Sequence, residues 1–172
     1  MTSPLDFATA VLQATGLPTS HNNLAAVVAW QKLEGGHFQA PSFAFNPLNT
    51  TQPMPGGVSR NSVGVKAYSS WDEGLAATVK TLKNGAYGGI LASLAASADP
   101  GQTLRAVDAS PWGTHNVPAD ASGYAAQAYS NYAHAADPIG GRLSSLRMPL
   151  ATLVAGLVLI AGVGYFAFTK VK

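Results

Sequence analysis

The chain has 172 residues, 47% of them hydrophobic and only 10% charged, and it contains no cysteine. This length accommodates one compact domain with an appendage rather than two full domains. The lack of cysteine excludes disulfides and thiolate chemistry. Residues 1–147 carry eight basic and eight acidic residues, so the net charge of +2 comes from Lys170 and Lys172. A neutral body lacks the basic surface of a nucleic-acid-binding protein, so we expect no nucleic-acid partner.

The first two predicted elements are helices with recognisable ends. Ser3 followed by Pro4 is typical of a helix cap and first turn, and Gly16 ends the apolar pattern that follows. A second helix is predicted over about residues 22–33, and its apolar residues are spaced so that most of it is buried. It stops where Glu34 and two glycines follow.

The remaining elements are one β insertion and several further helices. Residues 35–67 are rich in Gly, Pro, Asn, Ser and Thr, so we expect long loops with a small β-hairpin. Further helical patterns cover about residues 70–84, 89–96 and 122–136, with a short segment at 103–107. The predicted fold class is therefore α+β, mostly α, with a small β insertion between the second and third helices.

The end of the chain carries a long apolar segment. Residues 148–168 contain no charged residue, and basic residues flank them on both sides. At about 1.5 Å per residue, such a helix spans a hydrocarbon core of about 30 Å. The alternative, a buried core helix, is disfavoured because such a helix usually keeps a polar face. We expect a body over 1–136, a linker over 137–147, one transmembrane helix over 148–168 and a basic tail over 169–172, with membrane orientation left open.

The chain has only two glutamates, and one of them is placed for acid chemistry. Glu34 ends the buried second helix, with Trp30 one turn earlier on the same face. The negative end of the helix dipole and an apolar wall both favour the neutral carboxyl group and raise its pKa. A glycosidase needs such a proton donor near neutral pH. The alternative is a glutamate that merely ends a helix at the surface.

Several motifs in a fixed order accompany Glu34. The series AWxxLEGG, NPLNTT and SVGVKxYxSWxEGxxATxxTLxNGxYxxI resembles the lysozyme-like domains of phage and actinobacterial cell-wall enzymes. Relatives of those domains include lytic transglycosylases, goose-type lysozymes and bacterial glucosaminidases. The resemblance covers roughly residues 20–95, with a weaker echo in Ser110-Pro-Trp-Gly-Thr114.

The resemblance implies an activity for Glu34. In that superfamily the glutamate that closes a core helix is the general acid that protonates the glycosidic oxygen. In lytic transglycosylases the same carboxylate then acts as base for the sugar's own 6-hydroxyl, whereas in hydrolytic members a second group positions water. Asp108 is the only other carboxylate weighed as a partner, since Asp72 and Glu73 are expected to charge a helix N-terminus. Transglycosylase and hydrolase both stay open.

Six further residues are candidates for substrate binding: Asn46, Asn49, Tyr68, Tyr87, Trp112 and His37. The two asparagines could bind acetamido or hydroxyl groups, or they could belong to ordinary turns. The aromatic rings could stack on sugar rings, or they could belong to the core. His37 could line a cleft beside Glu34. The histidines lack metal-ligand spacing, so we expect no metal, and no cofactor is expected.

Together these features predict a membrane-anchored enzyme whose partners are peptidoglycan glycan strands and a lipid membrane. We expect a single-pass membrane protein in the internal membrane of a phage virion or in a bacterial inner membrane. Virion or membrane proteins are its expected further partners. The expected role is cell-wall penetration during genome entry. The alternatives are a non-catalytic glycan-binding or structural membrane protein of a virion, and a host enzyme that remodels the cell wall.

Overall fold

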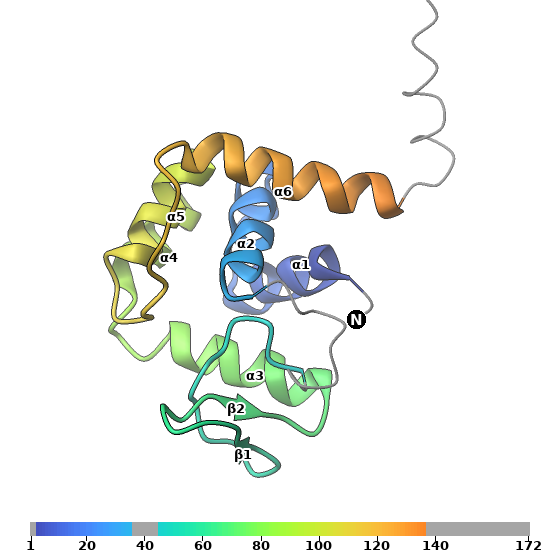
Figure 1. Ribbon diagram of the computed structural model, residues 1–172, viewed down its shortest axis with the longest axis vertical. Helices are drawn as coiled ribbons and strands as arrows, with labels where there is room; N and C mark the ends of the chain where they lie inside the picture. The colour runs from blue at the N-terminus through green and yellow to red at the C-terminus, as the bar shows by residue number, and fades with distance from the viewer. Residues whose placement is uncertain (1–2, 36–44, 137–172) are drawn as a thin grey trace, which may run out of the picture. The chain divides into compact units, whose positions relative to one another are not determined.

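The computed structural model describes residues 3–35 and 45–136 (Figure 1). The chain divides into two units, Met1–Ala133 and His134–Lys172. The predicted transmembrane helix over 148–168 and the candidate His37 lie outside the described residues. In the part of the chain that the structure describes, no helix has both the length and the apolar character needed to cross a membrane.

The first helix, α1 (Pro4–Thr15), has the ends that the sequence predicts. The Ser3 side chain accepts a hydrogen bond from the backbone N–H of Asp6, and the Asp6 carboxylate accepts one from the backbone N–H of Ser3. This reciprocal pair satisfies two donors that a helix start leaves free. Gly16 ends the helix with a φ of +78°, which glycine adopts without strain.

The second helix, α2 (His21–Leu33), lies in the middle of the described fold (Figure 1). It begins slightly earlier than predicted because the Ser20 side chain caps it, accepting a hydrogen bond from the backbone N–H of Asn23. Every residue from Ala25 to Gln31 is buried. The helix is therefore buried on all sides. Glu34, which directly follows it, lies next to the core.

A two-stranded antiparallel hairpin follows α2, as predicted. Strand β1 (Val58–Ser59) pairs with β2 (Lys66–Ala67), with Val58 opposite Ala67. Helix α3 (Trp71–Leu82) comes next, capped by the Ser70 side chain, and lies beside the hairpin in Figure 1. The predicted class, mostly helical with one small β insertion, is confirmed.

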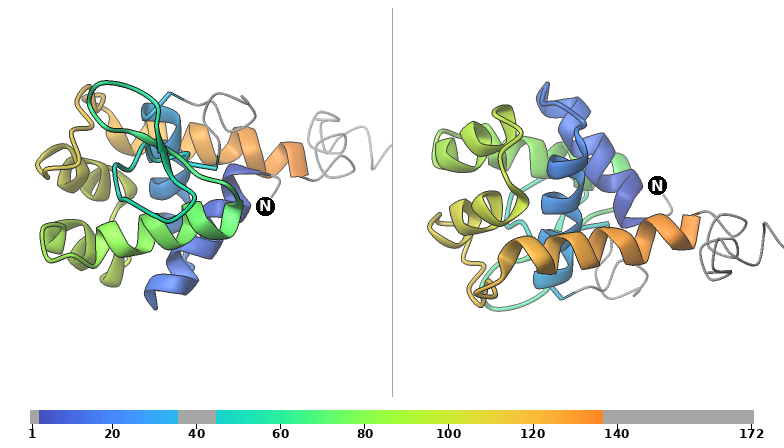
Figure 2. Two further views of the ribbon diagram at one scale, coloured as in Figure 1. Left: turned by 90° about the horizontal axis from the view of Figure 1, so that it is seen from below. Right: turned by 90° about the horizontal axis from the view of Figure 1, so that it is seen from above.

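Three further helices complete the described fold: α4 (Gly88–Ala95), α5 (Pro100–Asp108) and α6 (Ala121–Ala136). Helix α5 is longer than the predicted 103–107 segment because the Asp99 side chain caps it and Pro100 occupies its first turn. Figure 2 shows α6 crossing α2. The crossing is fixed by an edge-to-face contact of His21 with Tyr129 and by Lys32, whose Nζ lies 5.0 Å from the ring centroid of Tyr124.

One apolar core joins these helices. Helix α2 contacts α1 and α5, α1 contacts α3, and α4 contacts α5. The largest fully buried side chains come from nearly every element and include Trp30, Phe7, Leu12, Leu48, Leu82, Ile90, Leu94 and Leu104. Leu48 belongs to the described loop between residue 45 and β1, so this loop is anchored in the core at that residue.

Candidate active site

Glu34 is the residue at which α2 ends. Its backbone N–H still donates to the carbonyl oxygen of Trp30 at 3.0 Å, so the residue continues the helix for one last hydrogen bond. The buried helix positions the carboxyl group at the boundary between core and surface, where it is half-buried. The structure therefore confirms the prediction that Glu34 lies at the end of a buried helix.

Both oxygens of the Glu34 carboxyl group accept hydrogen bonds from side chains of distant segments. Asn49 Nδ2 donates to Oε2 at 3.0 Å and also to the backbone oxygen of Glu34 at 2.8 Å. The Thr114 hydroxyl donates to Oε1, and it accepts a hydrogen bond from Trp30 Nε1 at 3.2 Å. The carboxyl group is thus held in one orientation rather than free to rotate.

The surroundings shift the acidity of Glu34 in the direction that proton donation requires. Burial raises the pKa of this carboxyl group above its ordinary value of 4.5, and the hydrogen bonds from Thr114, Asn49 and Trp30 oppose that shift without cancelling it. Burial disfavours the charged carboxylate, whereas donors stabilise it. A general acid must still carry its proton at the working pH, so a raised pKa suits that role.

Three aromatic residues, Trp30, Trp112 and Tyr87, contact one another in succession. Trp30 is fully buried, and its ring meets that of Trp112 edge-to-face at 4.6 Å between centroids. Tyr87 meets Trp112 in the same way at 5.1 Å. Trp112 and Tyr87 are half-buried, so each keeps part of its ring accessible. These two predicted substrate-binding residues therefore lie together, and Trp112 contacts the Trp30 ring, whose indole donates to the Thr114 hydroxyl that binds Glu34.

Asn49, predicted to bind sugar or to belong to a turn, binds Glu34 through its side-chain amide. It adopts a left-handed backbone conformation with a φ of +52°, which asparagine tolerates better than most residues. This conformation accompanies a side-chain amide that binds both the carboxyl group and the backbone oxygen of Glu34. Asn49 is therefore a residue that holds Glu34.

Asn46 and Tyr68, two predicted sugar-binding residues, are buried and hydrogen-bond the protein backbone. Asn46 is 1% exposed, and its amide hydrogen-bonds the backbone of Thr50 and Lys66. Tyr68 is 3% exposed, and its hydroxyl donates to the backbone oxygen of Gln52 at 2.8 Å. Burial raises the pKa of Tyr68 to about 12. Both side chains organise the loops around the hairpin, where buried backbone groups need partners.

The carboxylates of Asp108 and Glu73 have neighbours other than Glu34. Asp108 lies 3.5 Å from Nδ1 of the exposed His115. Glu73 accepts hydrogen bonds from the backbone N–H groups of Gly56 and Ser69 and from the Ser69 hydroxyl. In the described residues, no group of three or more His, Cys, Asp or Glu side chains is placed to hold a metal ion.

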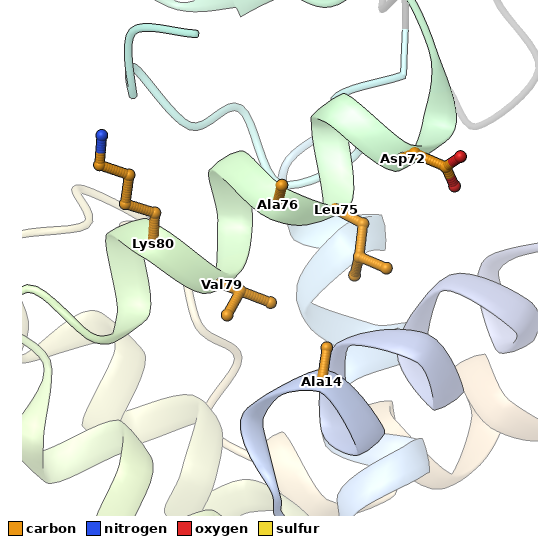
Figure 3. A pocket seen from close by; sticks show the side chains of 6 residues that line it. All are labelled: Ala14, Asp72, Leu75, Ala76, Val79 and Lys80. Atoms are coloured by element: carbon orange, nitrogen blue, oxygen red, sulfur yellow. The ribbon is translucent and has the colours of Figure 1, made fainter.

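A separate apolar pocket of about 380 Å³ lies between α1 and α3. Leu75 and Val79 of α3 and Ala14 of α1 point towards one another, whereas Lys80 points away from α1 and Asp72 extends to the side of α3 (Figure 3). None of its lining residues hydrogen-bonds Glu34. A space without convergent polar groups does not suit a sugar, whose hydroxyl groups need hydrogen-bond partners. The pocket lies where α1 packs against α3.

Thr114 is the site residue that sequence reasoning missed. It lies 80 residues after Glu34, outside any helix or strand, and its sequence neighbours give no reason to assign it a contact with Glu34. The sequence signal near it is the weak motif echo Ser110-Pro-Trp-Gly-Thr114, in which Trp112 is the predicted site residue.

Comparison with known proteins adds no relative. Neither a family model, nor a curated protein, nor a solved structure matches this chain.

Proposed function

We propose that this chain is a peptidoglycan-cleaving enzyme of the lysozyme-like kind, with Glu34 as its general acid. The observation that carries the proposal is the state of this carboxyl group. It is half-buried at the end of a core helix, its pKa is raised by burial, and both of its oxygens are fixed by donors. A surface glutamate that merely ended a helix would need none of these features.

The proposed reaction uses one carboxyl group twice. Protonated Glu34 gives its proton to the glycosidic oxygen as the bond from that oxygen to the anomeric carbon breaks. The resulting oxocarbenium-like carbon is attacked by water or by the sugar's own 6-hydroxyl, and the attacking oxygen returns its proton to the Glu34 carboxylate. Water gives a reducing end, and the 6-hydroxyl gives a 1,6-anhydro end.

Trp112 and Tyr87 support a sugar-binding role beside this acid. Both are half-buried and contact each other, and Trp112 also contacts the Trp30 ring. Aromatic side chains offer apolar faces for a ligand together with a polar edge. An uncharged, ring-shaped ligand suits a chain of which only 10% is charged.

The proposed setting comes from the sequence. The apolar segment over 148–168 would anchor the enzyme to a membrane by a single span. We place it in a phage virion with an internal membrane, where it would open the cell wall locally during genome entry. A host enzyme of cell-wall remodelling is the competing setting.

The experiment is a comparison of the full-length wild type with Glu34→Gln and Glu73→Gln on purified peptidoglycan. We expect Glu34→Gln to lose cleavage by about a hundredfold or more, because general acid catalysis contributes on that scale. Glu73→Gln is the matched control and keeps the wild-type rate. Equal cleavage by wild type and Glu34→Gln contradicts the role of Glu34. Binding without cleavage by any of the three chains favours a glycan-binding protein.

Mass spectrometry of the released fragments then defines the reaction. Anhydro-muramyl ends indicate transglycosylation, whereas reducing muramic acid or glucosamine ends indicate hydrolysis of one or the other bond.

A further inference from the structure

The hydroxyl group of Thr114 lies between two partners that fix the direction of its proton. Trp30 Nε1 lies 3.2 Å from Thr114 Oγ1, and Glu34 Oε1 is on the other side. An indole N–H can only donate, so the threonine oxygen must accept that hydrogen bond. A threonine hydroxyl has a single proton, which is then left for Glu34. Since Thr114 is buried, little water competes for either partner.

The segment that carries Thr114 is itself held in place. The Ser110 hydroxyl donates to the carbonyl oxygen of Val107 and accepts from the backbone N–H of Trp112, which fixes the turn after α5. The Trp112 indole donates to the carbonyl oxygen of Leu48 at 2.9 Å. Leu48 directly precedes Asn49, the other donor to Glu34. One indole therefore links the two segments whose side chains grip the carboxyl group.

We propose that Thr114 is a positioning residue for Glu34, with its hydroxyl set to donate by the indole N–H of Trp30. This inference rests on the proposed function, which makes the orientation of Glu34 matter. Thr114 acts through Glu34 and touches no reacting sugar atom. Its hydrogen bond orients the protonated acid before the reaction and stabilises the carboxylate that remains once the proton has moved to the glycosidic oxygen.

The direction of the effect follows from the chemistry of the pair. A donor to a carboxylate favours the charged form and so holds its pKa down. Removing the Thr114 hydroxyl should therefore raise the pKa of Glu34 further and also loosen the orientation of its side chain. A purely structural threonine would change neither the titration of Glu34 nor the pH profile of cleavage.

The test compares Thr114→Val with Thr114→Ser in the full-length chain. Valine keeps the shape but removes the hydroxyl, whereas serine keeps the hydroxyl. Thr19→Val, at an exposed turn, is the matched control. The first readout is the carboxyl 13C chemical shift of Glu34 against pH, observed in protein labelled at glutamate, and the second is the pH profile of peptidoglycan cleavage.

We expect Thr114→Val to raise the titration midpoint of Glu34, to shift the profile in the same direction and to lower the maximal rate by up to about a hundredfold. Thr114→Ser and Thr19→Val should stay close to wild type. Thr114→Ala, which also removes the hydroxyl but leaves a smaller side chain, should move the Glu34 midpoint in the same direction as Thr114→Val. It supplies the test if the valine variant does not fold.

Two results would overturn the inference. One is an unchanged Glu34 midpoint in a folded Thr114→Val. The other is a serine variant as impaired as the valine variant, which would assign the effect to the lost methyl group. Failure of the proposed function is distinguishable: if wild type cleaves no peptidoglycan, the enzymatic role falls, while the titration of Glu34 still decides whether Thr114 acts on its carboxyl group.

Discussion

The two glutamates of this chain occupy opposite kinds of helix end and differ in acidity. Glu34 closes α2 at its C-terminus, whereas Glu73 lies in the first turn of α3. Each accepts several hydrogen bonds, yet the pKa of Glu34 is raised and that of Glu73 is lowered. Hydrogen bonding alone therefore does not decide the acidity of a carboxyl group in this fold.

Burial is the main difference between the two sites. Desolvation is the largest influence on Glu34, whereas at Glu73 the hydrogen bonds from Ser69 and Gly56 dominate. Glu73 also lies where the helix dipole favours a negative charge, and Glu34 lies where the dipole opposes one. Glu34 is therefore suited to keep its proton, whereas Glu73 is suited to bind the backbone of a loop as a carboxylate.

The loop that Glu73 holds explains its contacts. Gly56 donates its backbone N–H to Glu73 Oε1 at 2.6 Å, and the Ser69 backbone donates to Oε2 at 2.9 Å. A Cβ atom on Gly56 would come within 2.6 Å of Glu73 Oε2, so only glycine leaves room for this approach without a shift of the side chain. The carboxylate thereby joins the loop before β1 to the start of α3.

The largest predicted effect is a loss of cleavage when the Glu34 side chain is shortened, and the same change at Glu73 is the comparison. Glu34→Asp withdraws the carboxyl group by one methylene from Thr114 and Asn49, so we expect about a hundredfold loss of cleavage, as small displacements of a catalytic group cause. Glu73→Asp should leave the rate unchanged, because Glu73 touches a loop rather than the site. The rates are measured by release of soluble peptidoglycan fragments. Equal rates for the two variants would remove the functional distinction between the glutamates.

The next effect is on the pH dependence of cleavage. Because Glu34 must be protonated to act, the rate should fall by about tenfold per pH unit above its pKa. That pKa is raised, so the fall begins at a higher pH than an ordinary carboxyl group with a pKa of 4.5 would give. The profile of Glu73→Gln should coincide with that of wild type. A fall that begins at or below pH 4.5 would contradict the acid role.

The smallest effect is on stability. The lowered pKa of Glu73 means that its contribution is present above its ordinary value of 4.5 and is lost as the pH falls through the folded pKa. Glu73→Gln should therefore melt slightly below wild type at neutral pH and level with it in acid. Glu34 has the opposite sign: its contribution is present at low pH and is lost as the pH rises through its raised pKa. The measurement is the melting temperature of wild type and Glu73→Gln at several pH values. A difference between the two melting temperatures that does not change with pH would contradict the lowered pKa of Glu73.

Local signals made most of the fold predictable. Cap residues such as Ser3 and Ser70 lie beside the helices they start, and Gly16 directly follows the helix it ends. These effects act within a few residues, so a sequence displays them. Helix α2 starts earlier than the apolar pattern predicts, because Ser20 caps it. Helix α5 is longer than the predicted segment, because Asp99 caps it and Pro100 begins it.

The site was only partly predictable because its contacts join segments far apart in the chain. The position and acidity of Glu34 follow from a buried helix end, which the sequence displays. The hydrogen bond from Thr114 spans 80 residues and leaves no local pattern. Asn46 and Asn49 look alike in sequence, yet one is buried against the loop backbone and the other holds Glu34. Only the fold separates them.

The most direct test of the account is the titration of both carboxyl groups in one sample. Full-length protein labelled with 13C at the glutamate carboxyl carbon gives two side-chain resonances, because the chain has two glutamates. Glu34→Gln and Glu73→Gln assign them. We predict that Glu34 titrates above 4.5 and Glu73 below it. A Glu34 midpoint at or below that of Glu73 would contradict the claim that burial keeps this carboxyl group protonated for catalysis.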